Sequence, residues 1–376
     1  MRILHIIVGL RVGGAELMLK RLVDSAREDL SHNQIVVSLT SIGEVGIQLQ
    51  KDGIVVHAIG MRSALNLPAA ILRLVQLIRN ENPDVIQTWM YHADLIGGIA
   101  ARVAGKYPVI WCIRSTTIPQ GILSFTYWLV RLCGLLSHLI PSKIICCANT
   151  AKSAHLQLFY PEKKIKVIPN GYDFKPLLEK ISSSQESREK LSIKENEIII
   201  GVVGRFDPLK DFYNFISAAA IIASQRKGVK FLMVGRGNEW SNPTLRHWIE
   251  EAGLAELFLL VGQQTDVPYF LSAMNIFCLS SVQEAFPNVV VEAMAMELPC
   301  VVTRAGDAAD ILCDERFIVP VNNSKALADS LLKVCELSSH DRQIIGQSNA
   351  KRVRNKYKIE KISKEYFEAY LSAIRK

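Results

Sequence analysis

The sequence lacks a Cys-x-x-Cys pair, although its 376 residues include eight cysteines. Most of these cysteines stand in apolar runs, such as residues 144–147 and 275–279. A structural metal site needs ligands that are clustered at short spacing, and the sequence shows no such cluster. Isolated cysteines in apolar runs instead predict buried free thiols in a protein of a reducing compartment.

Long uninterrupted apolar runs are also missing. The longest, residues 121–140, is broken by Arg131 and His138, whereas a spanning helix needs about 20 predominantly apolar residues. The pattern favours an amphipathic or buried helix, and an interfacial helix that touches lipid stays open. The apolar run at residues 3–8 is too short for a secretory signal and predicts a first strand.

Positive charge is unevenly distributed along the chain, whose net charge is +8. Residues 1–170 carry 18 Lys/Arg against 10 Asp/Glu, the tail 351–376 carries 9 against 3, and residues 171–350 are net acidic. This asymmetry predicts an anionic partner for part of the molecule, such as a membrane surface. No basic helix with interleaved aromatic residues occurs, so nucleic-acid binding is not indicated.

Strand-like and helix-like runs alternate almost throughout, which predicts parallel sheets covered by helices on both faces. The serine-rich segment 171–196 has no strand pattern and is interpreted as a linker. The fold class is therefore α/β, with two doubly wound, Rossmann-like domains facing each other across a cleft. Strands are expected near 2–9, 34–39, 54–59, 84–88, 108–113, 143–147, 165–168, 197–203, 229–235, 257–261, 275–279, 300–303 and 316–319. Helices are expected near 15–29, 67–80, 93–104, 121–139, 150–158, 211–226, 243–252, 266–273, 289–297, 324–337, 341–356 and 359–374.

In each half of the chain, a glycine-containing loop follows the first strand. Residues 9–16 include Gly13 and Gly14, whose lack of a side chain would let the backbone turn and approach an anion at a helix N-terminus. The segment is not Gly-x-Gly-x-x-Gly, so the dinucleotide-binding fingerprint is absent. Residues 203–211 include Arg205 and Lys210, and two cations on a loop at a sheet's carboxyl edge suit a diphosphate. The alternative for residues 9–16 is merely a tight turn, and the alternative for Arg205 and Lys210 is a pair of solvated surface cations.

A third motif, residues 280–292, reads as strand, loop and helix. Asn288 is expected to cap the helix, with the free N–H groups of residues 289–291 facing a phosphate. Glu284 on the loop and Glu292 one turn into the helix can bracket a ligand rich in hydroxyl groups. Two unrelated surface glutamates are the alternative.

These three motifs, together with residues 168–173, resemble the GT4 family of retaining glycosyltransferases, which have the GT-B fold. The resemblance covers nearly the whole chain, and the Glu-x7-Glu block followed by residues 293–295 is its most specific part. Residues 91–94 and 146–148 are similar to a subset that makes bacterial surface polysaccharides. The resemblance implies an acceptor-side domain, 1–172, onto which the C-terminal helix 358–376 packs, and a nucleotide-sugar domain, 173–357.

The resemblance also implies roles for individual residues. Arg205 and Lys210 would hold the donor diphosphate, Glu292 the ribose hydroxyls, and Glu284 the sugar, while His92 would lie near the transferred sugar. The catalytic set is thus Glu284, Arg205, Lys210 and His92. The donor-binding set is Gly13, Gly14, Ala285, Phe286, Pro287, Asn288, Val289 and Glu292. Neither a metal nor a cofactor is expected, and a front-face displacement with no protein nucleophile is the favoured mechanism.

Three positions depart from the family pattern. Ala285 and Glu297 stand where the family often has glycine, and Arg304 stands where it often has aspartate. Arg304 would add a cation near the donor loop, which leaves the identity of the base and sugar open. UDP is only the commoner donor nucleotide.

The implied activity is transfer of a sugar from a nucleotide-sugar donor to a lipid-linked oligosaccharide or another cell-surface glycan. A UDP-sugar epimerase and a non-catalytic nucleotide-sugar-binding protein of the same fold are the alternatives. The basic tail is expected to fold back on the basic first half. Both would then dock on the inner face of the cytoplasmic membrane and bring a cytoplasmic enzyme to an anionic surface.

Overall fold

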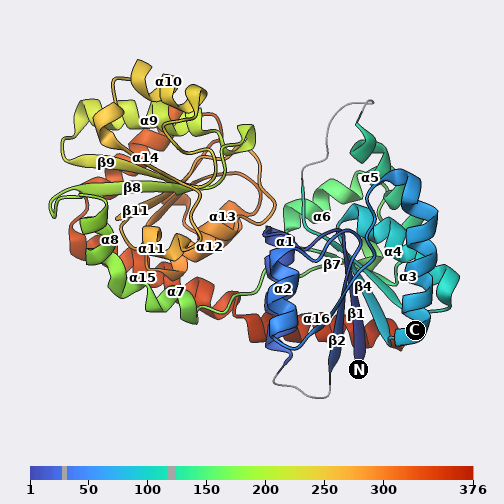
Figure 1. Cartoon of the computed structure of the whole chain (residues 1–376). Coiled ribbons are helices and arrows are strands. Elements are labelled where there is room, and N and C mark those ends of the chain that lie inside the picture. Colours follow the sequence, from blue (N-terminus) through green and yellow to red (C-terminus); the bar gives the residue numbers. More distant parts are fainter. Residues whose placement is uncertain (28–31, 117–123, 376) are drawn as a thin grey trace. The chain divides into compact units, whose positions relative to one another are not determined.

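The chain divides into two compact units in the computed structural model, which describes residues 1–27, 32–116 and 124–375 (Figure 1). The first unit comprises Met1–Tyr172 and Tyr357–Lys376, and the second comprises Asp173–Lys356. The last helix of the chain therefore belongs to the same unit as the first strand.

A parallel sheet forms the centre of the first unit. Its described strands follow the order β3-β2-β1-β4-β5-β6-β7, so the order reverses between β1 and β4. Its central strands, β2, β1, β4, β5 and β6, are short runs of mostly apolar, buried residues, as a sheet covered by helices requires, while the edge strands β3 and β7 are more exposed. Their bounds are β1 Arg2–Ile7, β2 Asn33–Ser38, β3 Val55–Ala58, β4 Val85–Trp89, β5 Val109–Ile113, β6 Lys143–Cys146 and β7 Ile165–Val167.

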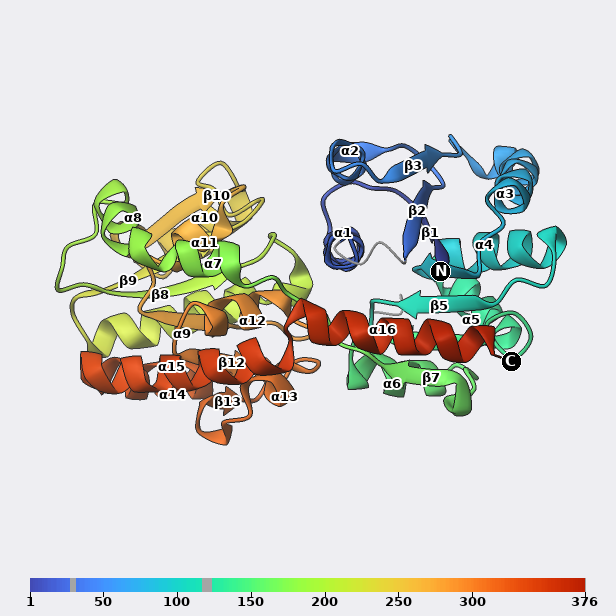
Figure 2. The ribbon, with the colours of Figure 1, turned by 90° about the horizontal axis from the view of Figure 1, so that it is seen from below.

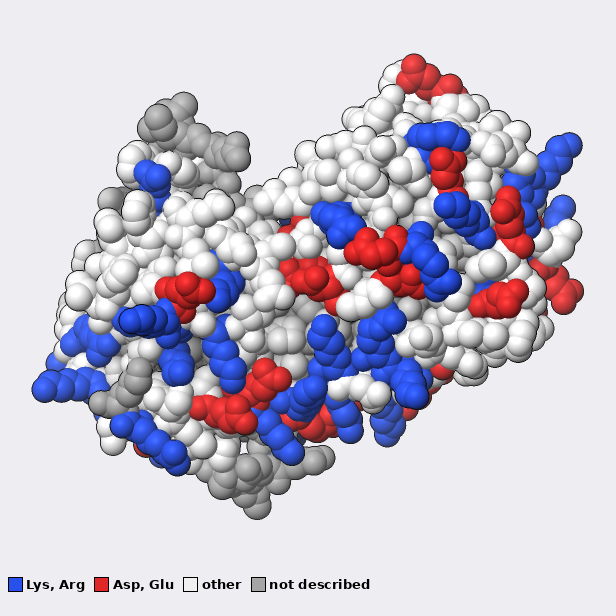
Figure 3. Space-filling model, turned by 180° about the vertical axis from the view of Figure 1, so that it is seen from behind, with Lys and Arg blue, Asp and Glu red and all other residues white. Residues whose placement is uncertain are grey.

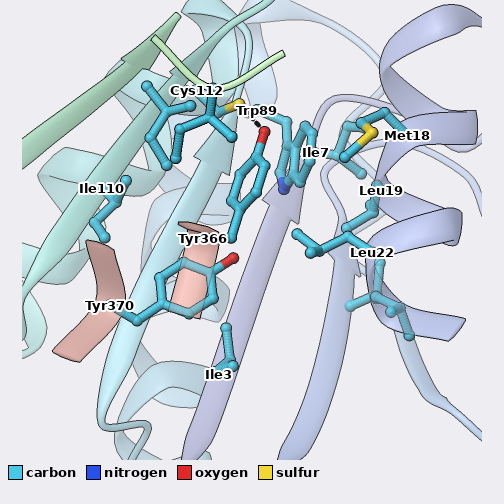
Figure 4. Close-up of a cluster of buried hydrophobic side chains, with 14 of the residues drawn as sticks. Ile3, Ile7, Met18, Leu19, Leu22, Trp89, Ile110, Cys112, Tyr366 and Tyr370 are labelled. Carbon is cyan, nitrogen blue, oxygen red and sulfur yellow. Dashed lines mark hydrogen bonds between the residues drawn. The ribbon is translucent and has the colours of Figure 1, made fainter. Parts of the chain in front are cut away.

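The helices of the first unit cover this sheet, and α16 (Ile359–Ile374) crosses it beside β5 (Figure 2). Tyr366 of α16 stacks on Trp89 (Figure 4), with ring centroids 6.4 Å apart. Tyr370 donates a hydrogen bond to the Gln87 side chain. These contacts fix the end of the chain in the core of the first unit. The other helices are α1 Gly14–Ser25, α2 Gly43–Lys51, η1 Ala64–Asn66, α3 Leu67–Glu81, α4 Tyr91–Ala104, α5 Phe125–Leu136, α6 Asn149–Leu156 and η2 Glu162–Lys164.

The second unit repeats this architecture. Its described strands are also parallel and follow the order β10-β9-β8-β11-β12-β13, with the reversal between β8 and β11. The strands are β8 Ile198–Val203, β9 Val229–Val234, β10 Phe258–Gly262, β11 Ile276–Leu279, β12 Cys300–Thr303 and β13 Ile318–Val319. The helices are α7 Lys175–Glu179, η3 Ile181–Ser183, α8 Ser184–Lys190, η4 Pro208–Lys210, α9 Phe212–Gln225, α10 Pro243–Glu251, η5 Ala255–Leu257, α11 Val267–Leu271, α12 Asn288–Ala295, α13 Ala308–Leu312, η6 Glu315–Phe317, α14 Ser324–Glu336 and α15 Ser339–Lys356.

The predicted parallel α/β alternation is confirmed, but the interpretation of residues 171–196 as a linker is wrong. That segment forms α7, η3 and α8 within the second unit. The Ser187 hydroxyl lies 3.0 Å from that of Ser272, and Arg188 donates to the carbonyl of Ala273 and the amide oxygen of Asn275. Short polar helices of this kind show no strong hydrophobic period, because few of their residues are buried.

The basic tail is not one helix. Lys358 has an extended backbone between α15 and α16, where Tyr172 N–H donates to Tyr357 O and Ile359 N–H donates to Tyr172 O. In the second unit, Arg352 donates to Leu312 O, and Arg354 donates to Ala295 O and pairs with Glu297. Figure 3 shows basic and acidic side chains interspersed on one face of the protein. Two of the tail's cations are therefore bonded within the second unit.

Seven of the eight cysteines are buried free thiols, as predicted, and Cys313 at the end of α13 is exposed. The predicted helix 121–139 is represented by α5, and its residues 121–123 lie outside the described part of the chain. The predicted helix 15–29 ends at Ser25, and residues 28 and 29 are likewise outside it. Among the described residues, no helix combines the length and apolar character that crossing a membrane requires.

The packing of α15 on the end of α12 gives a stability prediction. A Cβ atom at Gly346 would lie 1.7 Å from Glu297 O, so Gly346→Ala forces the two backbones apart. We expect a loss of about 1–3 kcal/mol in the free energy of unfolding, measured by urea denaturation. Ser348→Ala, an exposed change on the same helix, is the control and should stay within about 0.5 kcal/mol of the wild type. Equal stability of the two variants would contradict this packing.

Candidate active site

Two loops of the second unit meet where its strand order reverses. Residues 204–211 follow β8 and residues 280–287 follow β11, and these neighbouring strands end at the same edge of the sheet. There Lys210 Nζ lies 2.5 Å from Glu284 Oε1. The side chains of Lys210 and Glu284 are 22% and 14% exposed, so this ion pair is largely withdrawn from water. The structure thus brings together two of the predicted catalytic residues, one from each motif.

Neighbouring hydroxyl and backbone groups fix the position of this pair. Ser281 Oγ donates to the same Glu284 oxygen over 2.7 Å, and Ser280 Oγ donates to Lys210 O over 2.8 Å. Val282 N–H donates to Leu209 O over 2.9 Å and so ties the two loops together through their backbones. The carboxylate and the ammonium are therefore preorganised, which is how fixed charges stabilise a developing charge at low reorganisation cost.

Arg205 lies on the same loop but is engaged differently. Its Nε donates to Asp207 Oδ2 over 3.0 Å, and its side chain is 63% exposed. Partial burial by itself would raise the pKa of the Asp207 carboxyl. The hydrogen bond from Leu209 N–H and the nearby Arg205 outweigh this effect, so the pKa of Asp207 is lowered. Arg205 is thus an exposed cation beside the Lys210–Glu284 pair, held by a carboxylate that stays ionised.

Helix α12 follows the Glu284 loop, and its start differs from the prediction. The helix begins at Asn288, the cap position is Pro287 with an extended backbone, and the cap lacks a side-chain hydrogen bond. Val290 N–H donates to Pro287 O over 3.1 Å, so one of the N–H groups expected to face a phosphate is already used. Glu292 is half-buried one turn into the helix. Proline at the cap explains the error, because the extended conformation it favours replaces the side-chain cap.

The loop after β12 also supports the Glu284 loop, and the sequence motifs did not include it. Thr303 Oγ1 donates to Ser281 O over 2.6 Å, and Asp307 N–H donates to Ala285 O over 3.0 Å. Gly306 has a φ of +57°, and a Cβ there would lie 2.3 Å from Glu284 O. Because β12 pairs in parallel with β11, its carboxyl end lies at the same edge of the sheet. Ligands bind at this edge in parallel sheets, so applying that rule to a third strand would have identified these residues.

The departures from the family pattern have structural explanations. Glu297 has a φ of +63°, a conformation that glycine adopts without strain, and its carboxylate pairs with Arg354 Nη2 at 3.1 Å. Arg304 lies 2.5 Å from Glu315 Oε2, and both side chains are exposed. The charge of Arg304 is thus paired with a carboxylate on η6.

The predicted residues of the first unit lie at the starts of α1 and α4, the helices that follow β1 and β4, where the strand order of that sheet reverses. Helix α1 begins at Gly14, and Gly13 is its cap with φ −163°. Neither glycine has a positive φ, so the turn itself does not require glycine at these positions. Burial raises the pKa of Glu16 in the first turn of α1.

His92 lies in the first turn of α4 and is half-buried. Its ring centroid is 6.3 Å from that of Phe125, and burial lowers its pKa, which favours the neutral imidazole. Asp94 on the same turn is buried, and Thr88 Oγ1 donates to it over 2.5 Å. Burial raises the pKa of Asp94 well above its usual value.

Comparisons with known proteins agree with this geometry. The model of "Glycosyltransferase Family 4" matches residues 12–175, and that of "Glycosyl transferases group 1" matches residues 183–352. An Escherichia coli UDP-Gal:alpha-D-GlcNAc-diphosphoundecaprenol alpha-1,3-galactosyltransferase is 25% identical over 71% of this chain and 70% of its own. The capsular polysaccharide biosynthesis glycosyltransferase CapM of Staphylococcus aureus is 27% identical over 85% of this chain and 86% of its own.

Solved structures show the same fold. The crystal structure of Anabaena Alr3699/HepE in complex with UDP superposes with a TM-score of 0.84 over 99% of this chain and 100% of that one, at 23% identity. The two parallel α/β units, with charged loops at their carboxyl edges, define a glycosyltransferase with the GT-B fold. More narrowly, the chain belongs to glycosyltransferase family 4. The transferase interpretation is thereby favoured over an epimerase or a non-catalytic binding protein.

The contact between Gly306 and the Glu284 loop can be tested directly. Gly306→Ala places a Cβ against Glu284 O and strains a left-handed backbone. We expect the loop to shift and the transfer rate, as kcat/KM, to fall at least tenfold. Gly253→Ala is the control, because Gly253 also has a positive φ of +69° but has open space around its Cβ position. An equal loss in both variants would show that backbone strain alone is responsible.

Proposed function

We propose that the chain is a retaining glycosyltransferase that moves a sugar from a UDP-sugar to a lipid-linked oligosaccharide or another cell-surface glycan. The observation that carries the proposal is the preorganised Lys210–Glu284 pair at the carboxyl edge of the second sheet. A UDP-linked galactose donor and a diphosphoundecaprenol acceptor in the name of one relative support the donor and acceptor classes. UDP and UDP-glucose in complexes of a protein of the same fold support a UDP-sugar donor further.

The proposed chemistry requires stabilisation of a departing diphosphate. As the bond between the anomeric carbon and the diphosphate breaks, negative charge grows on the phosphate oxygens. Lys210 and Arg205 would stabilise that charge, and Glu284 keeps the Lys210 ammonium fixed in position. Glu292 would accept hydrogen bonds from the donor ribose, while His92, Gly13 and Gly14 would contribute from the first unit. A front-face displacement, in which the departing phosphate takes the acceptor proton, needs no protein nucleophile.

The second proposal concerns the ion requirement and the place of action. Lys210 and Arg205 carry the positive charge that a divalent metal supplies in other glycosyltransferases, so we propose that transfer is metal-independent. We also propose that the enzyme acts at the inner face of the cytoplasmic membrane, because a polyprenyl-linked acceptor is anchored in a membrane.

Loss of Lys210 should abolish turnover. We expect Lys210→Ala to lower kcat by about 10²–10³-fold, since it removes a charge that acts mainly in the transition state. Transfer from UDP-sugars to extracted bacterial glycolipid, followed by mass spectrometry, measures this. Glu292→Ala should also abolish detectable transfer, through weaker donor binding.

A matched control is available within the same unit. Lys230 pairs with Glu197 at 3.3 Å, and these side chains are 19% and 13% exposed, close to the values for Lys210 and Glu284. Lys230→Ala thus removes a similar ion pair from the start of β9, away from the loops after β8 and β11. It should leave kcat within about twofold of the wild type. Equal losses in the two lysine variants would attribute the effect to stability and would contradict the catalytic role.

Removal of divalent ions tests the metal proposal. The transfer rate in excess EDTA should equal the rate in magnesium or manganese. A rate that falls at least tenfold in EDTA and returns when manganese is added would contradict metal independence and leave the transferase activity itself intact.

A further inference from the structure

Helix α5 of the first unit has apolar side chains on its outer face as well as its inner face. Leu129, Val130 and Cys133 are buried, and a Cβ at Gly134 would lie 2.2 Å from Leu158 O, so the inner face is packed closely. The outer apolar face, which we call the α5 face, comprises Phe125, Trp128, Leu132, Leu135 and Leu139 at 73%, 51%, 44%, 63% and 76% exposure.

The spacing of the α5 face shows that it is a continuous stripe. Phe125, Trp128, Leu132 and Leu135 recur at intervals of three and four residues, which places them on one side of α5, and Leu139 lies in the turn that follows. Phe159, 67% exposed, extends the stripe, because His138 Nε2 lies 2.8 Å from Phe159 O. Contiguous exposed apolar surface of this kind marks an interaction site, whereas single exposed apolar residues do not.

The end of α5 is held rigidly on the unit. Lys164 Nζ donates to the carbonyls of Ser137, His138 and Pro141, at 3.0, 2.7 and 2.9 Å. These three carbonyls belong to the turn that follows α5, so Lys164 fixes that turn against the start of β7. The α5 face is therefore presented outward by a fixed scaffold beside α4 (Figure 1).

The residues around the α5 face are predominantly basic. Residues 91–164, which include α4, β5, α5, β6, α6 and η2, contain eight Lys/Arg and two Asp/Glu, of which Asp94 is buried and Glu162 pairs with Lys152. Arg131 lies on α5 itself, with its guanidinium 5.0 Å from the ring centroid of Tyr127. A surface with apolar and aromatic side chains and predominantly positive charge nearby matches the acyl–headgroup boundary of an anionic bilayer.

We propose that the α5 face inserts into the interfacial region of a membrane that carries anionic lipids. This inference deepens the proposed function, because it assigns the membrane contact of an enzyme whose acceptor is lipid-linked. Unlike the basic tail, the α5 face offers a stripe of exposed apolar side chains as well as nearby positive charge. Trp128 and Phe125 would lie at the boundary, with Arg131 near the headgroups.

Vesicle flotation of the full chain tests the proposal. Vesicles of phosphatidylcholine with 30% phosphatidylglycerol should bind the wild type several-fold more than vesicles of phosphatidylcholine alone. The double variant Trp128→Gln/Leu132→Gln should lower the bound fraction at least fivefold. The control Leu72→Gln/Val103→Gln changes two exposed apolar residues on α3 and α4 of the same unit and should bind as the wild type does. Equal binding of both double variants, or an absence of wild-type binding, would overturn the proposal.

Two further measurements distinguish insertion of α5 from binding through another surface and from dimerisation. Brominated lipids should quench tryptophan fluorescence of the wild type, and Trp128→Phe should lose most of that quenching while still floating with the vesicles. Unchanged quenching in Trp128→Phe would overturn insertion of α5. If light scattering shows a dimer that Trp128→Gln/Leu132→Gln dissociates, a second copy covers the α5 face and the proposal is wrong.

The vesicle assay uses no donor, so it is independent of catalysis. Wild-type binding to anionic vesicles without transfer from any nucleotide sugar would overturn the proposed function and support the membrane contact. Transfer to a water-soluble acceptor without vesicle binding would support the transferase activity and overturn the membrane contact.

Discussion

The Lys210–Glu284 ion pair depends on the reversal of strand order between β8 and β11. In a parallel sheet the connections on the two sides of such a reversal run to opposite faces, which leaves space between the loops at the carboxyl edge. Here the loops after β8 and β11 occupy that position, and Lys210 Nζ lies 2.5 Å from Glu284 Oε1. Ser280, Ser281 and Val282 then hold the loops in register through bonds to Lys210, Glu284 and Leu209. The candidate site is thus a consequence of topology before it is a consequence of any one residue.

This arrangement explains why a cation can be kept half-buried before any substrate binds. A lysine withdrawn from water without a partner loses hydration energy, and a hydrogen-bonded carboxylate compensates for that loss. On the proposed function, the donor diphosphate would share the ammonium with Glu284, so the charge is in place in advance. The loop after β12 adds to this preorganisation, because Gly306 lets its backbone approach Glu284 O closely.

The alternation of strands and helices was predictable because strands buried on both faces appear as short apolar runs. The proximity of Lys210 and Glu284 was predictable from the motifs, because each residue lies on a loop that follows a strand and the two strands end at the same edge of the sheet. The failures have local physical causes. Pro287 rather than Asn288 is the cap of α12, since an extended proline serves there without a side-chain bond. Residues 171–196 fold into short helices whose hydrogen bonds, such as Arg188 to Ala273 O, have no periodic signature. Glu297 occupies a left-handed conformation that the sequence alone marks as a glycine position only by comparison with the family.

The uneven charge was the clearest numerical feature of the sequence, but charge counts do not reveal which charges are available for binding. The tail 351–376 is strongly basic, yet its charges are divided between α15 and α16, which belong to different units. Arg354 is further committed to Ala295 O and Glu297. Residues 91–164 contain eight basic groups and two acidic ones, Asp94 and Glu162, and α5 within this range bears an exposed apolar stripe. An anionic bilayer attracts unneutralised charge and retains apolar surface, so the location and pairing of charges outweigh their number. By that reasoning the apolar stripe on α5, together with the basic charge near it, supports the proposed membrane contact.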